Sequence, residues 1–139
     1  MTAVVQRQIK KTEVFDVWLA ELQDQVGKAA ITDRIDRVKN GNMGDVRKVK
    51  GVQGLYEIKV DVGPGYRVYF VLIGANIVFI LLGGDKSRQD ADIAKASAML
   101  DDMKRAQAAG RKMREAEERA NQKVAEKFRK SYKSKRKSS

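Results

Sequence analysis

The sequence contains no histidine and no cysteine among its 139 residues. These two absences exclude disulfide bonds, thiolate zinc sites, cysteine nucleophiles and catalytic triads that depend on an imidazole. Proline occurs once, and no apolar run approaches the roughly 20 residues that span a bilayer. The N-terminus also lacks the pattern of a secretory signal peptide. We therefore expect a cytoplasmic protein that has no membrane-spanning segment and needs no metal or other cofactor.

Positive charge is abundant and unevenly distributed. The chain has 29 Lys and Arg residues against 18 Asp and Glu, a formal net charge of +11. Residues 1–100 contain 15 basic and 12 acidic side chains, whereas residues 101–139 contain 14 and 6. Most large apolar residues precede position 100, which predicts one folded domain over 1–100 and a basic tail over 101–139. The excess charge favours a polyanionic partner, which could be a nucleic acid, an acidic protein or an anionic membrane surface.

Hydrophobic periodicity predicts a strand and two helices near the N-terminus. Residues 2–8 form a short strand candidate. After Thr12, a predicted N-cap, apolar residues recur every three or four positions over 14–22, and Gly27 is expected to end this helix. A second apolar helical face follows over 30–38 and is closed by an Asn-Gly-Asn turn. Two helices joined by so few residues predict a helical hairpin.

After this hairpin the period falls to two residues. Alternating or continuous apolar runs predict strands over 55–61, 66–72 and 77–82, separated by glycine-rich turns. The pair Gly83-Gly84 is expected to stop the third of these strands, and a helix is expected from about Ser87. The order β-α-α-β-β-β-α indicates an α+β fold, in which the helical hairpin packs on a small, mostly antiparallel sheet.

The basic tail is predicted to be a long helix. Small and apolar residues recur at helical spacing from Met103 to Phe128, although most of them are alanine and Gly110 weakens the pattern. This seam either packs on a partner or on the core, or belongs to a solvated helix. Residues 131–139 are so basic and polar that we expect them to be disordered.

Cationic side chains are predicted to gather on one face of the sheet. Strand alternation places Arg67 and Tyr69 opposite their core-facing neighbours, on an exposed face together with Glu57 and Lys59. Further basic residues flank this face in the sequence: Arg47, Lys48, Lys50, Lys86 and Arg88. Such a patch suits phosphate groups, because guanidinium binds phosphate in a bidentate manner and lysine adds a mobile charge. The alternative is that these charges only protect an exposed strand face from aggregation.

Acidic residues near the start of the last domain helix are compatible with a metal site but have a simpler explanation. Asp85, Asp90 and Asp92 supply the carboxylates that Mg²⁺ prefers. We favour a different role, in which they stabilise the positive end of the helix dipole. Phosphodiester cleavage without metal or histidine is chemically feasible, since lysine can accept a proton, arginine can stabilise a phosphorane and tyrosine can donate a proton.

An ordered set of motifs resembles the addiction module killer proteins. The segments are RIDR at 34–37, GNMGDV at 41–46, GPGYRVYF at 63–70 and GGDKSRQDADI at 83–93. The resemblance covers about residues 8–98, and it is to a branch of the RelE/ParE superfamily of type II toxin–antitoxin toxins. It implies a RelE/ParE-like fold and a cognate antitoxin, a helix-turn-helix or acidic protein that forms a hetero-oligomer with the toxin.

The resemblance also implies roles for particular residues. In nuclease members, a strand arginine within the Tyr-Arg-Val motif contacts the scissile phosphate, and Arg67 occupies that position. Lys59 matches the second of two strand lysines and Lys86 a basic residue after the last strand. Glu57 replaces the first lysine, and the helix tyrosine of some members has no counterpart, which leaves Tyr69 as the candidate acid.

These implications predict a metal-independent, ribosome-dependent mRNA endonuclease. Arg67, Lys59, Lys86 and Tyr69 would form its catalytic set, and Arg47, Lys48, Lys50 and Arg88 would bind the RNA backbone. Two alternatives remain open from the sequence. One is a non-enzymatic inhibitor of DNA gyrase of the ParE type, and the other is a non-toxic accessory protein that binds nucleic acid.

Overall fold

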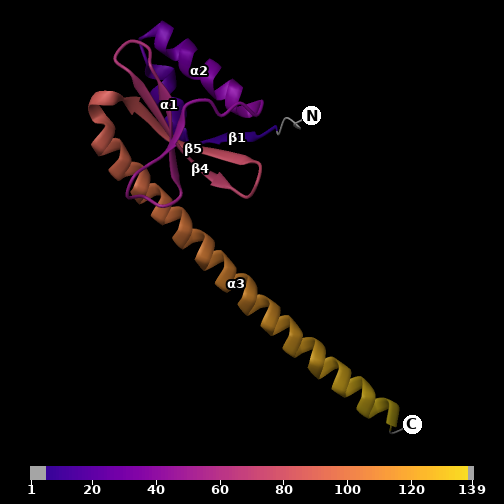
Figure 1. Ribbon diagram of the computed structural model, residues 1–139. Coiled ribbons are helices and arrows are strands. Elements are labelled where there is room, and N and C mark those ends of the chain that lie inside the picture. Colours follow the sequence, from indigo (N-terminus) through magenta and orange to yellow (C-terminus); the bar gives the residue numbers. More distant parts are fainter. Residues whose placement is uncertain (1–5, 138–139) are drawn as a thin grey trace. The chain divides into compact units, whose positions relative to one another are not determined.

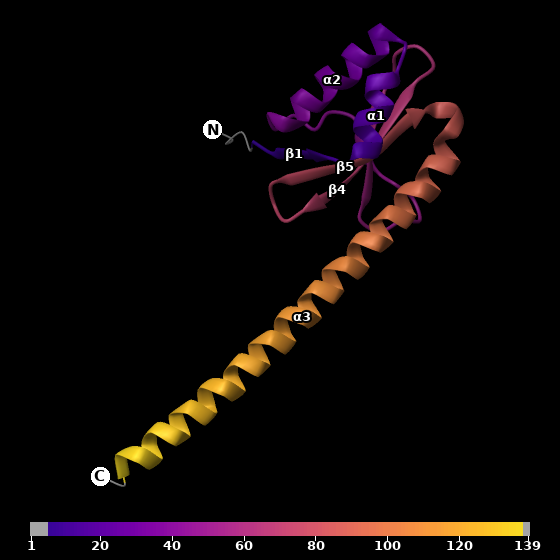
Figure 2. The ribbon, with the colours of Figure 1, turned by 180° about the vertical axis from the view of Figure 1, so that it is seen from behind.

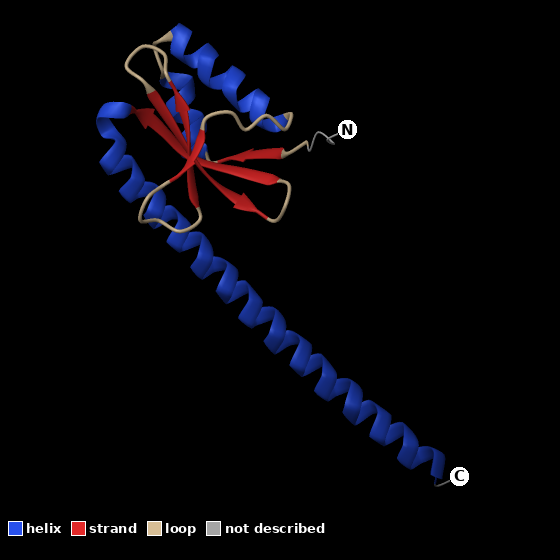
Figure 3. Cartoon of the chain, viewed as in Figure 1, coloured by secondary structure: helices blue, strands red, loops and turns tan. Residues whose placement is uncertain are grey.

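The structure is a computed structural model that describes residues 6–137, and its chain divides into two compact units, residues Met1–Leu100 and Asp101–Ser139. The first unit contains the sheet, two helices and the beginning of a third helix. That third helix, α3 (Gln89–Lys137), continues through the second unit. Figures 1 and 3 show the sequence of elements.

Five strands form one sheet in the order β1-β5-β4-β3-β2. Their bounds are β1 (Gln8–Lys11), β2 (Val46–Lys48), β3 (Leu55–Val60), β4 (Tyr66–Ile73) and β5 (Ile77–Asp85). Only β1 pairs in parallel, with β5, while every other pair is antiparallel. The expectation of an α+β fold with a mostly antiparallel sheet is confirmed.

The first helix, α1 (Glu13–Glu21), is attached to the sheet through its N-cap. Thr12 Oγ1 accepts a hydrogen bond from the amide of Phe15 at 3.1 Å, as predicted, and donates one to the carbonyl of Leu81 at 2.5 Å. Leu81 is the extra residue of a β-bulge, since Tyr69 pairs with Leu82 and Phe70 with Ile80. The cap therefore satisfies a carbonyl at the bulge and fixes α1 on β5. Figure 2 shows α1 in front of the strands.

The second helix, α2 (Gln25–Lys39), begins earlier than predicted. Asp24 caps it, with Oδ1 accepting from the amide of Gly27 at 3.0 Å, and its Oδ2 accepts from the hydroxyl of Tyr66 at 2.6 Å. The expectation that Gly27 ends the first helix was wrong, because this capping bond starts a new helix at that point. A side chain at Gly27 would also meet Tyr66, whose Cε2 would lie 2.5 Å from a Cβ. The predicted helical hairpin is otherwise present.

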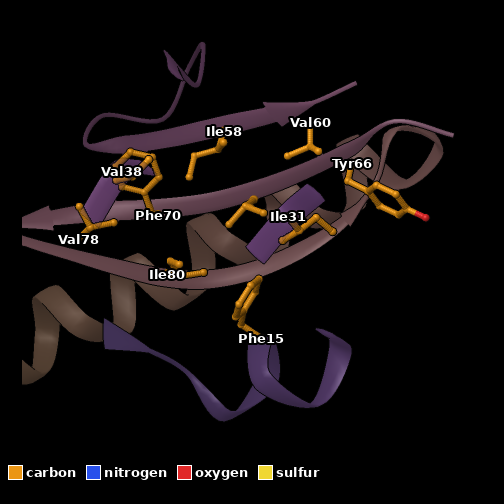
Figure 4. Packing of buried hydrophobic residues seen from close by; sticks show 10 residues of the cluster. Phe15, Ile31, Val38, Ile58, Val60, Tyr66, Phe70, Val78 and Ile80 are labelled. Atoms are coloured by element: carbon orange, nitrogen blue, oxygen red, sulfur yellow. The ribbon is translucent and has the colours of Figure 1, made fainter. Parts of the chain in front are cut away.

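The main core lies between these helices and one face of the sheet. Phe15 from α1 and Ile31 and Val38 from α2 are fully buried. They pack against inward-facing strand residues (Figure 4), and the ten buried members of this cluster are Phe15, Ile31, Val38, Ile58, Val60, Tyr66, Val68, Phe70, Val78 and Ile80. The predicted apolar face of the strands is thus confirmed.

The first turns of α3 cover the opposite face of the sheet. Ala96 and Leu100 are buried, and the Leu100 side chain approaches Gly54 at the start of β3. A short 3₁₀ helix (Lys86–Arg88) connects β5 to α3, close to the predicted helix start. Because α3 covers this face, side chains that alternation assigned to an exposed surface are buried.

The strand β5 does not stop at the glycine pair, contrary to the expectation. Gly83 pairs with Val68 and Gly84 with Arg67, and the strand continues to Asp85. A Cβ on Gly83 would lie 2.5 Å from the ring of Trp18, and one on Gly84 would collide with the Asp92 carboxylate. The glycines therefore let α1 and α3 approach the two faces of one strand.

Two strands differ from the predictions near the edges of the sheet. The predicted strand over 2–8 falls largely on residues 1–5, which lie outside the described residues, and β1 begins only at Gln8. Its register follows from parallel pairing with β5. The three-residue strand β2 was not predicted, since so short a polar segment shows no periodicity.

The second unit consists of the continuation of α3, and every residue from Arg111 to Lys133 is exposed. Met113, Val124 and Phe128 are among the exposed large apolar side chains. Disorder was expected over residues 131–139, but residues 131–137 are helical, and residues 138–139 lie outside the described residues. Lysine and arginine are good helix formers and stabilise the negative end of the dipole. Among residues 6–137, no helix is long and apolar enough to cross a membrane.

Candidate functional site

Arg67 is the second residue of β4 and is paired with Lys59 of β3 on one side and with Gly84 of β5 on the other. Only 7% of the residue is exposed, although alternation predicted an exposed side chain. Its Nη1 lies 3.8 Å from Oε1 of Glu57, which is itself 8% exposed. Gln89 at the start of α3 donates to the other Glu57 oxygen at 3.4 Å. The charge of Arg67 is therefore balanced by a buried carboxylate beneath α3.

Tyr69 is completely buried, which corrects its predicted place on an exposed face. Its hydroxyl has no hydrogen-bond partner among the described residues. Burial raises the pKa of Tyr69, and the nearby Glu57 carboxylate raises it further. A phenol that is both inaccessible and a weaker acid than usual is poorly suited to protonate a leaving group, so the structure does not support Tyr69 as the acid.

Lys59 and Arg67 are brought together as a directly opposed cross-strand pair. Side chains of such a pair lie on the same face of the sheet. The Lys59 side chain is 26% exposed and lies 3.8 Å from Asp61. Lys86 is exposed just beyond β5, where its amide donates to the carbonyl of Gly65 at 2.8 Å. Of the four predicted catalytic residues, the two lysines are accessible and the other two are not.

The four predicted RNA-binding residues do not form one surface. All are exposed, but Arg47 is paired in register with Glu57 and Lys48 with Tyr56. Neighbouring strand residues point to opposite faces, so Arg47 and Lys48 lie on different sides of the sheet. Lys50 follows β2 in a turn, and Arg88 ends the 3₁₀ helix at the other end of the sheet. The backbone-binding patch predicted from sequence is therefore divided.

A cavity of about 290 Å³ opens beside Arg88, and the sequence analysis missed it. It lies where α1, the end of β5 and the first turns of α3 meet. Its lining residues are Val14, Trp18, Leu82, Gly83, Gly84, Asp85, Arg88, Asp92 and Lys95. The available signal was the glycine pair, because small residues inside a strand mark a close approach of other groups.

Asp92 is the buried acidic group of this cavity. The residue is 8% exposed, and its Oδ2 has no hydrogen-bond partner among the described residues. Burial raises the pKa of Asp92, while Arg88 acts in the opposite direction and Asp85 adds to the increase. Asp85 accepts from the amide of Ser87 at 2.9 Å and so caps the 3₁₀ helix, in line with the dipole interpretation. Within residues 6–137, no three acidic side chains are arranged to hold a metal ion.

The fold is that of the RelE toxin. A structure of a double mutant of the E. coli toxin RelE in the free state superimposes with a TM-score of 0.53 at 16% identity, covering 70% of this chain and 97% of that one. The crystal structure of the intact E. coli RelBE toxin–antitoxin complex matches with a TM-score of 0.43 at 19% identity, over 60% of this chain and 96% of that one.

The chain belongs to the family of phage-derived Gp49-like proteins (DUF891), whose model matches residues 17–108. A protein of Haemophilus influenzae, described as uncharacterized, is 43% identical over 96 residues, which cover 69% of this chain and 95% of that protein. The resemblance to RelE-like toxins that the motifs indicated is thus confirmed at the level of the fold.

Proposed function

We propose that this protein is the toxin of a type II toxin–antitoxin pair and that it cleaves mRNA on the ribosome without a metal ion. The observation that carries the proposal is the RelE toxin fold together with Lys59 and Arg67 as opposed neighbours near Lys86. Lysine and arginine side chains on a common strand face can hold a phosphodiester and stabilise the charge that develops during its cleavage.

The accessible lysines have the leading roles in this proposal. Lys59 and Lys86 supply charge and proton transfer at the scissile phosphate. Arg67 is buried beside Lys59, and it contacts the phosphate directly only when its ion pair with Glu57 opens. Arg88 holds the RNA backbone at the same end of the sheet. Tyr69 has no part in the reaction.

A cognate antitoxin is the partner in this proposal. The first hundred residues carry a small excess of positive charge and the tail a larger one. An acidic segment of an antitoxin would cover exposed lysines by charge complementarity and would compete with RNA for them. Binding would form a toxin–antitoxin hetero-oligomer in which the RNA-binding residues are occupied.

A growth assay tests the proposal. Induced alone in a bacterial host, the chain is expected to arrest growth, and co-expression of the adjacent gene is expected to restore it. Mapping of mRNA ends should show cuts that depend on ribosomes. The double variant Lys59→Ala, Lys86→Ala should abolish both effects, whereas the matched control Lys10→Ala, at an exposed site on the edge strand β1, should not. Unimpaired growth at high expression without any partner contradicts the proposal.

Inhibition of DNA gyrase without catalysis is the second candidate. The observation that favours it is the burial of Arg67 and Tyr69, which leaves few accessible groups for acid–base chemistry. Under this alternative, induction causes DNA damage and filamentation while mRNA stays intact. The same end mapping therefore separates the two functions.

A further inference from the structure

The cavity beside Arg88 combines features that nothing in the proposed catalytic set uses. It adjoins the cross-strand pair of Lys59 and Arg67, because Gly84 is the cross-strand neighbour of Arg67 and also lines the cavity. Its volume of about 290 Å³ is near the lower end of the range for ligand pockets. A single planar group fits such a space better than an extended ligand does.

One wall of the cavity is aromatic and held in place. Trp18 lines the cavity and lies against Gly83, where no side chain separates it from the strand. Its ring centroid is 5.8 Å from that of Phe15 and 6.2 Å from that of Tyr66. An indole held in place by two neighbouring aromatic rings offers a flat surface on which a nucleobase can stack.

The polar element of the cavity is the carboxyl group of Asp92. It is more than nine-tenths buried and has an oxygen without a partner among the described residues. Leaving a buried acceptor unpaired costs free energy, which a ligand with N–H groups would recover. Gly84 makes room for this carboxyl group, since any side chain there would collide with it. The local sequence therefore maintains a buried acceptor that the fold itself does not use.

The rim of the cavity carries positive charge. Arg88 and Lys95 are exposed, while the Oδ1 atom of Asp85 is already engaged by Ser87. Two cations at the rim repel a guanidinium or ammonium ligand, although such a ligand would suit Asp92. They attract an anion, so the ligand must present neutral N–H donors at one end and a phosphate at the other.

We propose that this cavity binds a guanine base of RNA and so gives the cleavage reaction its base preference, an inference that rests on the proposed function. Guanine presents two adjacent N–H donors, N1 and the exocyclic amine, to the Asp92 carboxylate, whose side chain rotates toward the cavity because Oδ2 is otherwise covered. Its ring stacks on Trp18, and its phosphate binds Arg88 and Lys95. Adenine lacks this pair of adjacent donors, and pyrimidines offer a smaller stacking surface.

Trp18 is the only tryptophan in the chain, so its fluorescence reports directly on the cavity. The full-length protein is titrated with 5′-GMP, 5′-IMP and 5′-AMP. We expect 5′-GMP to quench the fluorescence in a saturable manner. IMP lacks the exocyclic amine and should bind about ten-fold more weakly, as expected for one lost hydrogen bond to a charged group. AMP and inorganic phosphate should bind more weakly still.

Two variants and one control test the assigned contacts. Asp92→Asn preserves the shape but replaces one acceptor by a donor, and Gly84→Ala displaces the carboxyl group. Each should weaken 5′-GMP binding by about ten-fold or more. Asp90→Asn, at an exposed position two residues away on α3, should bind as the unmodified protein does. A thermal melt of each variant shows whether it is folded. If Gly84→Ala does not fold, the binding data for Asp92→Asn alone test the inference.

Equal binding of 5′-GMP and 5′-AMP, or binding unaffected by Asp92→Asn, overturns the inference. Quenching by inorganic phosphate as strong as that by 5′-GMP also overturns it, because the rim alone would then account for binding. Failure of the proposed function looks different. If mRNA stays intact while 5′-GMP binds in an Asp92-dependent manner, the cavity assignment stands and the nuclease does not. If cuts occur without guanine nearby and Asp92→Asn leaves them unchanged, the nuclease stands and the cavity assignment fails.

Discussion

Two buried acidic residues lie where the first turns of α3 meet the sheet, Glu57 on β3 and Asp92 on α3 itself, and their situations differ. Glu57 is balanced by Arg67 at 3.8 Å and by Gln89 at 3.4 Å. Asp92 has an oxygen with no such partner among the described residues. Withdrawing a charge from water is costly unless a partner compensates for it. The first residue is therefore part of a structural pair, and the second is a local source of instability.

Replacing Arg67 should destabilise the fold. Strand alternation alone predicted an exposed side chain, but Arg67 is buried beside Glu57, and its truncation would leave Glu57 buried without this partner. Arg67→Ala is expected to lower the free energy of unfolding by about 3–5 kcal/mol, as for other broken buried pairs. Urea unfolding followed by Trp18 fluorescence measures this change. Lys59→Ala, which disrupts a more exposed pair, is the control and should cost about 1 kcal/mol or less. If both variants lower the free energy of unfolding by similar amounts, the buried Arg67–Glu57 pair does not stabilise the fold as proposed.

Replacing Asp92 should have the opposite effect at neutral pH. Because burial raises the pKa of Asp92 in the folded protein, its ionised form is unfavourable above that pKa. Asp92→Asn should therefore unfold at a higher urea concentration than the unmodified protein at pH 7. As the pH falls toward about 4, the ordinary pKa of aspartate, Asp92 becomes protonated in the unmodified protein. The difference in stability between the two proteins should then shrink. A difference that grows on acidification would mean that the carboxylate stabilises the fold.

Acid should weaken the junction between α2 and the sheet. The hydroxyl of Tyr66 and the amide of Gly27 both donate to Asp24 and lower the pKa of this carboxyl group. Its stabilising contribution is complete above the ordinary pKa of aspartate and is lost as the pH falls through the lowered value. Tyr66→Phe should therefore reduce the loss of thermal stability as the pH falls below about 4, the ordinary pKa of aspartate. An unchanged acid dependence would show that the Tyr66 hydrogen bond does not set this pKa.

At the scale of elements, the first turns of α3 belong to the folded domain. Among the residues of α3 whose burial is described, the buried apolar ones are Ala96 and Leu100, and Gln89 bonds to Glu57. A chain ending at Leu100 is expected to melt cooperatively, within a few degrees of the full chain. A chain ending at Arg88 lacks α3, so one face of the sheet is uncovered. Its free energy of unfolding should be lower by about 3 kcal/mol or more. Differential scanning calorimetry of the two truncations measures both effects, and loss of the cooperative transition in the longer one would make the tail part of the core.

The elements that the sequence could predict are those whose own residues carry the signal. The Thr12 cap and the apolar strands over 55–72 follow from local chemistry and period. The cap of α2 is local as well, because Asp24 accepts from the amide of Gly27, but the glycine favoured a helix end at that point. What local chemistry could not predict is the second bond of Asp24, from Tyr66, 42 positions away. Burial of Arg67 depends likewise on α3, which covers a face that alternation alone would leave to solvent. The cavity forms where three elements meet, so its glycine pair was the one local signal in the sequence that could indicate it.

At the scale of the whole molecule, charge and core are carried by different units. Residues 1–100 supply the sheet and nearly all buried apolar residues, with 15 basic and 12 acidic side chains. Residues 101–139 carry 14 basic and 6 acidic ones, and residues 101–137 are helical. Neutralising phosphates with such side chains releases counterions, which provides affinity for RNA without sequence preference. The tail would thus raise the local concentration of RNA, while the first unit provides selectivity.

The salt dependence of RNA binding should show that the charge of the tail provides this affinity. Each phosphate that a basic side chain neutralises on single-stranded RNA adds about 0.7 to the negative slope of log K against log salt concentration. The triple variant Lys123→Gln, Lys127→Gln, Lys133→Gln keeps the helix, since glutamine is a good helix former, and removes three exposed charges. Its slope for a single-stranded RNA of random sequence should be less steep by about 2. Fluorescence anisotropy between about 50 and 200 mM salt measures both slopes. The slope for the chain ending at Leu100 should be less steep again, because this chain lacks all the basic residues of 101–139. Identical slopes for the full chain and the truncated one would place the RNA-binding charge on the first unit, and the basic helix would then have no role in holding nucleic acid.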